Sequence, residues 1–279
     1  EIGSGLVGSE MCIRDRGITV TQIDERLPVK NEHDELGELA LAFNALLDRV
    51  EKTFNDQRMF VSNVSHELRT PMAALSAELD LALQKERTVT QYQNSIHNAL
   101  QDSQRVIELI DGLLNLAKAD YYPEQIKKEE IRLDELLLDA NELVLKAHPD
   151  YHIELIFEQE ADDDRVLTVI GNPYLLTTAF VNLIENNCKY SDNRTSFIQI
   201  SFCDQWTIVS LSDNGAGMSE TDKENLFKLF YRGENKNQAQ GHGIGMTLTK
   251  KILTLHKSEI SVYSHQGEGT TFVIRFHHL

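Results

Sequence analysis

Residues 64–71 contain three side chains that could carry a group-transfer reaction. Glu67 follows His66 directly, and Thr70 comes four residues after the histidine. Four residues make about one turn of a helix, so His66 and Thr70 would share a face, with Glu67 alongside. A neutral imidazole can attack a phosphoryl group if a carboxylate accepts or orients the proton that the ring sheds. His66 is therefore a candidate nucleophile; the alternative is a solvated histidine beside an acid.

Two glycine-rich stretches could hold a phosphate-bearing ligand. Residues 241–246, GHGIGM, open a predicted helix, whose first N–H groups carry partial positive charge. This string differs from the dinucleotide fingerprint, because its third glycine comes one residue too early and no βαβ unit surrounds it. Residues 213–217, DNGAG, follow a predicted strand, and their glycines leave no side chain between backbone and ligand. On its own, the second stretch is equally compatible with a turn.

A long helical pattern would position the histidine. Apolar residues recur at helical spacing over residues 34–85, with an interruption at Pro71, where we expect a local bend. A polar turn at residues 86–90 leads into a second helix with a similar apolar stripe, which ends before residues 121–123. Two helices cannot bury both stripes alone, so the pattern predicts a dimeric four-helix bundle.

Beyond Pro123 the pattern changes to mixed helix and strand, which predicts an α/β sandwich with one mixed sheet. The fold class is therefore a helical bundle followed by an α+β domain. Helices are expected at residues 133–145, 172–190 and 244–256. Strands are expected at residues 153–157, 166–170, 197–202, 207–211, 259–264 and 271–276.

Composition excludes several classes of protein. The 279 residues are 41% hydrophobic and 25% charged, which is enough apolar mass for more than one domain. A net charge of -17 would repel a phosphate backbone, so no nucleic-acid partner is expected. Cys12, Cys188 and Cys203 are too far apart in sequence to indicate a zinc site or a disulfide framework. The sequence has no run of eighteen apolar residues, so it contains no predicted membrane span.

Residues 60–71, FVSNVSHELRTP, resemble the histidine box of sensor histidine kinases. Four more stretches resemble boxes of that family and follow in its order: residues 182–190 (N box), 213–217 (first glycine box), 226–232 (F box) and 241–246 (second glycine box). Residues 34–39, DELGEL, resemble the turn that opens the second helix of a HAMP linker. Residues 1–16 resemble translated sequencing-adapter sequence, and we expect a disordered, non-native leader there.

The resemblance implies a role for each candidate residue. His66 would accept the phosphoryl group, Glu67 would assist proton transfer, and Thr70 would orient water for a reverse, phosphatase reaction. Asn186 would bind Mg²⁺ through its amide oxygen, and Asp213 would accept the amino hydrogen of adenine. Phe227 and Phe230 of the F box are expected to pack rather than to bind. The remaining implied nucleotide contacts are Asn182, Lys189, Tyr190, Gly215, Gly217, Arg232, Gly241, Gly243 and Gly245.

The resemblance also implies an activity. A homodimer would phosphorylate itself on His66 with ATP and Mg²⁺, and would pass the group to an aspartate of a response regulator. The expected domains are a HAMP remnant (17–52), a phosphotransfer hairpin (53–122) and an ATP-binding domain (123–279), which would swing on residues 121–123. The HAMP resemblance implies the cytoplasmic part of a bacterial inner-membrane protein, with its membrane segments before residue 17.

Two alternatives remain at this point. One is an ATP-binding regulatory protein or serine kinase of the GHKL fold that does not use His66. The other is a dimeric scaffold with a decayed nucleotide domain. The sequence departs from the family at Asn187, where small residues are usual, and at residues 256–258, where HKS replaces a common His-Gly-Gly turn. Both departures could change how the nucleotide fits.

Overall fold

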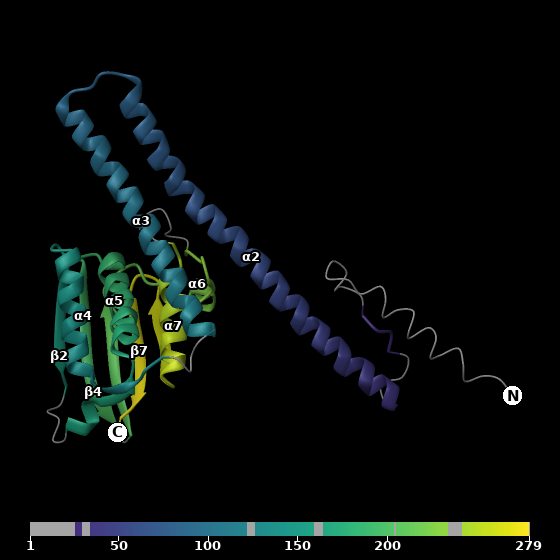
Figure 1. Cartoon of the computed structure of the whole chain (residues 1–279). Coiled ribbons are helices and arrows are strands. Elements are labelled where there is room, and N and C mark those ends of the chain that lie inside the picture. The colour runs from purple at the N-terminus through teal and green to yellow at the C-terminus, as the bar shows by residue number, and fades with distance from the viewer. Residues whose placement is uncertain are drawn as a thin grey trace, which may run out of the picture. The chain divides into compact units, whose positions relative to one another are not determined.

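The computed structural model describes residues 26–29, 34–121, 126–158, 164–203, 205–233 and 242–278. The chain divides into two units, Glu1–Glu67 and Leu68–Leu279. Figure 1 shows the order of the helices and strands. The expected leader at residues 1–16, residues 122 and 123 of the expected hinge, and Gly241 lie outside the described residues.

Helix α2 (Glu35–Gln84) confirms the long helix that the apolar spacing predicts. Its start is capped by Asp34, whose Oδ1 accepts a hydrogen bond from the Gly37 N–H at 2.7 Å. Glu35 and Glu38 add negative charge in the first turn, which favours a helix N-terminus. The helix continues through Pro71 without a break.

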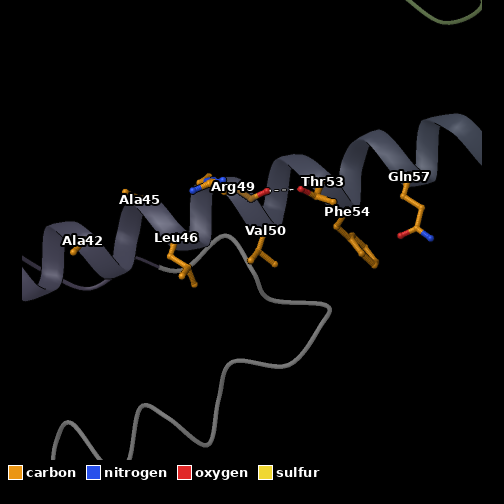
Figure 2. Close-up of a pocket in the computed structure, with 8 residues that line it drawn as sticks. All are labelled: Ala42, Ala45, Leu46, Arg49, Val50, Thr53, Phe54 and Gln57. Carbon is orange, nitrogen blue, oxygen red and sulfur yellow. Dashed lines mark hydrogen bonds between the residues drawn. The ribbon is translucent and has the colours of Figure 1, made fainter. Parts of the chain in front are cut away.

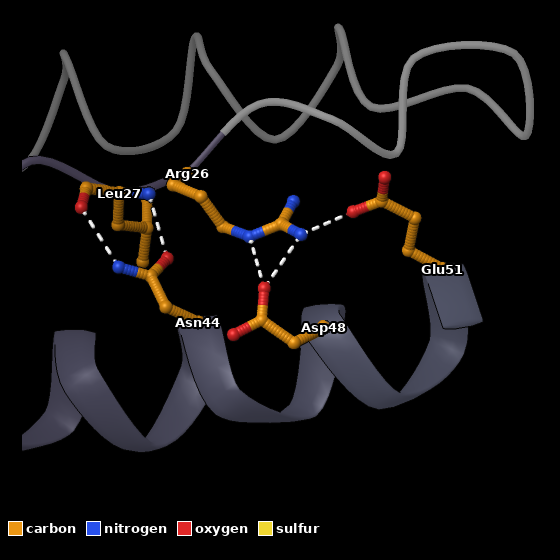
Figure 3. A network of polar contacts seen from close by, with 5 residues as sticks. All are labelled: Arg26, Leu27, Asn44, Asp48 and Glu51. Carbon is orange, nitrogen blue, oxygen red and sulfur yellow. Dashed lines mark hydrogen bonds and ion pairs between the residues drawn. The ribbon is translucent and has the colours of Figure 1, made fainter. Parts of the chain in front are cut away.

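In the first unit, a segment at residues 26–29, which is neither helix nor strand, is tied to α2 by side chains of the helix. The Asn44 amide accepts from the Leu27 N–H at 2.8 Å and donates to the Leu27 carbonyl at 3.0 Å (Figure 3). The Arg26 guanidinium lies 2.6 Å from Asp48 and also contacts Glu51. These carboxylates raise the pKa of Arg26, which stays charged. Two backbone hydrogen bonds of Leu27 and the ion pairs of Arg26 therefore hold this segment against α2.

The same unit carries an open groove along one side of α2, between residues 42 and 57. The apolar side chains Leu46, Val50 and Phe54 point to the same side of the helix, as Figure 2 shows. The remaining lining residues are Ala42, Ala45, Arg49, Thr53 and Gln57. This groove is an apolar strip of the kind that a neighbouring helix packs against.

Helix α3 (Val89–Tyr121) begins after a turn whose cap is specified locally. Thr88 and Gln91 form a reciprocal pair: Thr88 Oγ1 accepts from the Gln91 N–H at 3.3 Å, and Gln91 Oε1 accepts from the Thr88 N–H at 3.0 Å. This capping box confirms the predicted turn and places the start of the helix at residue 89.

The sandwich is built on a five-stranded sheet in the order β2-β4-β5-β7-β6. Its strands are β2 (His152–Phe157), β4 (Thr195–Cys203), β5 (Trp206–Asp213), β6 (Glu259–His265) and β7 (Gly269–His277). Strands β2 and β4 are parallel and the other neighbours are antiparallel, so the sheet is mixed, as predicted. Figure 1 shows the helices α4 (Leu133–Ala147), α5 (Pro173–Tyr190) and α7 (Gly245–Leu255) on one face of this sheet.

The prediction of a single sheet is wrong. The stretch expected as a strand at residues 166–170 begins as a 3₁₀ turn, η2 (Asp164–Leu167), and continues as β3 (Thr168–Gly171). Strand β3 pairs with β1 (Glu129–Arg132) in a separate two-stranded sheet. Strand β1 has the sequence EEIR, whose single apolar residue gives no alternating pattern, so the sequence offers no signal for it. The short helix α6 (Glu220–Asn225) was also not predicted.

The helix-facing side of the sheet is arranged in rows across the strands. The register places Ile200, Val209 and Ile274 in one row and Ile198, Leu211 and Phe272 in the next, all buried. The following row changes character, because it consists of polar residues. We call it the polar row, and its members, from β4 to β6, are Ser196, Asp213, Thr270 and Ser264.

Candidate functional site

Asp213 is the ionisable residue of the polar row, and it is only 5% exposed. Its Oδ1 accepts a hydrogen bond from the Gly215 N–H at 2.8 Å. Burial raises the pKa of Asp213 to about 6, while hydrogen bonds from the backbone of Gly215 and Thr270 oppose that rise. A buried carboxylate of this kind can accept a strong hydrogen bond from a donor group of a ligand.

The first glycine stretch is packed against neighbouring backbone on both sides. A Cβ on Gly215 would lie 1.9 Å from the Tyr190 carbonyl oxygen, at the end of α5. Gly217 has a φ of +64°, and a Cβ there would lie 1.9 Å from the His265 carbonyl oxygen. Backbone packing alone therefore requires glycine at both positions. The close approach of a ligand, which the sequence suggests, would be a second reason. This packing holds Asp213 directly beside the C-terminal end of α5.

Helix α5 presents three half-buried polar side chains at helical spacing, Asn182, Asn186 and Lys189. Burial lowers the pKa of Lys189, and the nearby charge of Arg232 lowers it further. Arg232 also acts on Tyr190, so the segment after α6 lies close to the end of α5. Arg232 therefore lies near Lys189 and Tyr190, which the sequence analysis names with it as nucleotide contacts.

The second glycine stretch meets the middle of α5. A Cβ on Gly245, the first residue of α7, would lie 3.3 Å from Asn182 Oδ1. Gly243 has a φ of +68°, and its carbonyl accepts from the Phe230 N–H at 2.8 Å. The N-terminus of α7, with its outward N–H groups, therefore lies next to Asn182 of α5.

These residues fit a nucleotide. Asp213 offers a buried acceptor to a base, while the start of α7 and the cations Lys189 and Arg232 offer positive charge to phosphates. Within the described ranges, no group of three or more His, Cys, Asp or Glu side chains could hold a metal ion. A site with one or two protein oxygens suits Mg²⁺, because that ion usually takes its other ligands from phosphates and water. The amide of Asn186 fits such a role.

The candidate acceptor residues lie together on α2. His66 and Thr70 are exposed and Glu67 is half-buried, all on one unbroken helix. His66 is therefore not packed in an apolar seam, which would have prevented its use as a nucleophile.

Several polar residues around Asp213 were missed by the sequence analysis. Ser264 Oγ accepts from the Met218 N–H at 2.9 Å, donates to the Gly269 carbonyl at 2.8 Å and lies 3.0 Å from Thr270 Oγ1. Asn187 Nδ2 donates to Ser196 Oγ at 3.3 Å. One signal could have revealed this row: each strand has a Ser, Thr or Asp at the position where the alternation calls for an apolar residue.

The second family departure lies at the far end of α7. Lys257 has a φ of 56°, a conformation that favours glycine and that explains the glycine usual at this turn. His256 contacts the Ile252 carbonyl at 2.6 Å through Nδ1, and its Nε2 accepts from the Asn172 N–H at 2.9 Å. Burial lowers the pKa of His256, which favours this neutral state. The turn therefore joins the end of α7 to the start of α5, whereas the asparagines lie toward the other end of α5.

Comparisons with known proteins agree with this geometry. The family described as "Histidine kinase-, DNA gyrase B-, and HSP90-like ATPase" matches residues 171–279. The "His Kinase A (phospho-acceptor) domain" matches residues 56–121, and the HAMP domain matches residues 1–52. The signal transduction histidine-protein kinase ArlS of Staphylococcus aureus is 27% identical over 256 residues, which cover 90% of this chain and 55% of ArlS. The chain therefore spans about half the length of the curated relatives that it matches.

Solved structures share the fold at low sequence identity. The histidine kinase ThkA in complex with the response regulator protein TrrA has a TM-score of 0.63 at 16% identity, over 82% of this chain and 64% of that one. Full-length ShkA in complex with AMPPNP has a TM-score of 0.57 at 17% identity, over 79% of this chain and 46% of that one. The order of a HAMP domain, a phospho-acceptor hairpin and an ATPase sandwich identifies the chain as a member of the sensor histidine kinase family.

Proposed function

We propose that this protein transfers the γ-phosphoryl group of ATP to His66 and then to an aspartate of a response regulator. The observation that carries the proposal is the combination, on one chain, of an exposed His66 beside Glu67 and a sandwich with the polar and charged groups of a nucleotide site. A chain with the sandwich alone would bind a nucleotide without having an acceptor of its own.

In this proposal, the ATP site is formed by α5, the polar row and the start of α7. Asp213 accepts a hydrogen from the adenine amino group, and Tyr190, which is 41% exposed, packs near the ring. Asn182 and Asn186 face the phosphates, Asn186 as the Mg²⁺ ligand. The complex of ShkA with AMPPNP supports an ATP-like ligand for this fold. The site also includes the other residues that the sequence suggests, namely Gly215, Gly217, Gly243, Gly245, Lys189 and Arg232. Gly241, which belongs to the same proposal, lies outside the described residues.

Phosphorylation of His66 is a displacement at the γ-phosphorus. The bond from an imidazole nitrogen to phosphorus forms as the bond from phosphorus to the bridging oxygen breaks, and ADP leaves. Glu67 accepts or orients the proton that the ring gives up, which keeps the attacking nitrogen a good nucleophile. Mg²⁺ would screen the charge of the transferring group. The phosphohistidine then donates its phosphoryl group to the aspartate carboxylate of the response regulator, as the bond from the imidazole nitrogen to phosphorus breaks. In the opposing phosphatase reaction, Thr70 orients the water that hydrolyses the aspartyl phosphate to aspartate and inorganic phosphate.

We also propose a homodimer as the active form and a response regulator as the partner. Large apolar side chains remain exposed along both helices of the hairpin, among them Leu79 and Leu83 on α2 and Ile96, Leu100 and Leu114 on α3. Burying them in a bundle of two hairpins would remove this apolar surface from water. The complex of ThkA with TrrA supports a response regulator as the partner class.

The membrane attachment and the domain boundaries belong to the same proposal. Among the helices of the described ranges, none has the length and apolarity that crossing a bilayer requires. The HAMP match and the likeness to ArlS support attachment of the natural protein to a bacterial inner membrane, with the described part on the cytoplasmic side. The boundaries at residues 16, 52 and 122, and the hinge at residues 121–123, stay predictions.

Labelling with γ-³²P ATP tests the proposal. We expect acid-labile, base-stable label on the full chain and none on His66→Gln. His97→Gln, which removes an exposed histidine of α3, is the matched control and should keep the label. Alkali-labile label on Ser or Thr that persists in His66→Gln would instead support the serine kinase alternative. A chain that binds ATP but takes no label would support a regulatory module.

A further inference from the structure

Asn187 has an unusual environment for a polar side chain. It is fully buried on α5, and its Nδ2 donates to Ser196 Oγ at 3.3 Å. Its Oδ1 is buried without a hydrogen-bond partner in the described part of the chain. A buried acceptor that lacks a partner destabilises the fold, so a ligand that supplies a donor there gains a hydrogen bond without competing with a protein group.

Through its bond to Ser196, Asn187 is connected to the polar row that contains Asp213. Ser196, which holds the amide of Asn187, precedes the Phe197–Ser212 pair of the register and so lies opposite Asp213 in the polar row. The end of α5 is also tied to this place, because Ser191 forms a β-bridge with Gly215. The charge of Asp213 is near enough to act on the thiol of Cys188, the residue after Asn187. Two acceptors, a carboxylate and an amide oxygen, therefore lie close together in a buried setting.

We propose that Asn187 is a base-specificity residue of the nucleotide site. An exocyclic amino group has two hydrogens: Asp213 accepts one and Asn187 Oδ1 accepts the other. A purine with a keto oxygen at that position would place a third acceptor against these two and would leave both unpaired, so it is rejected. Ser196 is a positioning residue, because it holds the Asn187 amide with its oxygen toward the base. This inference rests on the proposed ATP site.

Nucleotide titrations of the full chain test the role of Asn187. They compare ATP, GTP and the triphosphate of purine riboside, which lacks the amino group. We expect Asn187→Ala to weaken ATP binding by about fivefold to tenfold, as loss of one hydrogen bond predicts, and to change binding of the purine riboside triphosphate by less than about twofold. The preference for ATP over GTP should fall by a similar factor.

The matched control is Asn141→Ala, because Asn141 Oδ1 on α4 is also buried without a partner in the described chain. It should leave the affinity for all three nucleotides unchanged. Thermal unfolding without nucleotide shows that each variant is folded, and the comparison of ATP with the purine riboside triphosphate on the unaltered chain needs no variant at all.

Equal weakening of ATP and of the purine riboside triphosphate by Asn187→Ala would overturn the inference, since it would show a merely structural role. The inference would also be overturned if Asn187→Ala weakened GTP binding, because an acceptor that rejects GTP should not help to bind it. If the unaltered chain binds none of the three nucleotides, the proposed function itself fails. If it binds ATP and the purine riboside triphosphate equally, the role of Asn187 fails together with the contact of Asp213 to the amino group, whereas ATP binding and phosphoryl transfer to His66 still stand.

Discussion

The helical hairpin and the sandwich handle their apolar residues in opposite ways. In α2, a helix of fifty residues, Leu47 and Pro71 are the buried apolar side chains, while Leu36, Leu46 and Leu83 are more than half exposed. In α5, eight of eighteen residues are buried, including Phe180 and Leu183. Two helices of one chain cannot bury the whole of their apolar stripes against each other. A sheet with helices packed on one face can bury its apolar residues within a single chain. The sandwich completes its own core, and the hairpin requires a partner.

This difference also separates the two halves of the proposed reaction. The acceptor lies on the exposed surface of a helix, where a phosphoryl group and later a second protein can reach it. The donor site is built from buried polar groups, whose hydrogen-bonding directions are fixed by the surrounding core. A buried site can select a nucleotide by unpaired acceptors, which an exposed helix surface cannot do because water satisfies its groups.

The largest expected effect is on the core of the sandwich. Phe180 is fully buried, with its ring centroid 6.1 Å from that of Phe276. We expect Phe180→Ala to lower the free energy of unfolding of the sandwich by about 3–5 kcal/mol, through lost burial and a residual cavity. Urea unfolding followed by the fluorescence of Trp206 on β5 measures the change. Phe157→Ala is the control, because Phe157 is 46% exposed and should cost less than about 1 kcal/mol.

The next prediction concerns the hairpin. Leu100 on α3 is 65% exposed, and in the proposed bundle it becomes buried. We expect Leu100→Asp to weaken dimerisation by on the order of 100-fold, because an unpaired charge would enter the apolar seam, and to leave ATP affinity within about twofold. Sedimentation and nucleotide titration measure the two effects. Gln101→Asp, on the next residue, should leave the dimer intact. A Leu100→Asp dimer of undiminished stability would remove the basis for the contrast between the two regions.

The smallest effect expected is the pH dependence of nucleotide affinity. Burial raises the pKa of Asp213 from its usual 3.8 to about 6, so the apo protein holds this proton more tightly than the unfolded chain does. Ionising Asp213 thus costs folding stability as pH rises from about 4 to about 6, whereas binding an amino donor favours the carboxylate. We expect ATP affinity at pH 5 to be about tenfold lower than at pH 7.

Asp213→Asn is the control for that titration. It should bind ATP more weakly at pH 7 and show only the pH dependence that comes from the nucleotide phosphates. A wild-type profile that parallels the Asp213→Asn profile would mean that Asp213 does not contact the nucleotide.

Local features of the chain could be predicted because their signals are local. The spacing of apolar residues predicted α2 to within one residue at each end, and the start of α5 agrees because Asn172 caps it with Pro173 in the first turn. Motif residues that share one helix, such as Asn182 and Asn186, could also be grouped from spacing. Strand β1 could not be predicted, because its pairing with β3 and not its composition makes it a strand.

The sequence alone identified the candidate residues for the proposed chemistry, namely His66 on its helix and the nucleotide-binding boxes in their order. Only the tertiary structure showed that Ser196, Asp213, Thr270 and Ser264 form one row, with Asn187 bonded to its first member. The physical reason is the range of the interactions. Helix periodicity and caps are set by residues within about four positions of one another, whereas a row across a sheet depends on the register of strands that are distant in sequence.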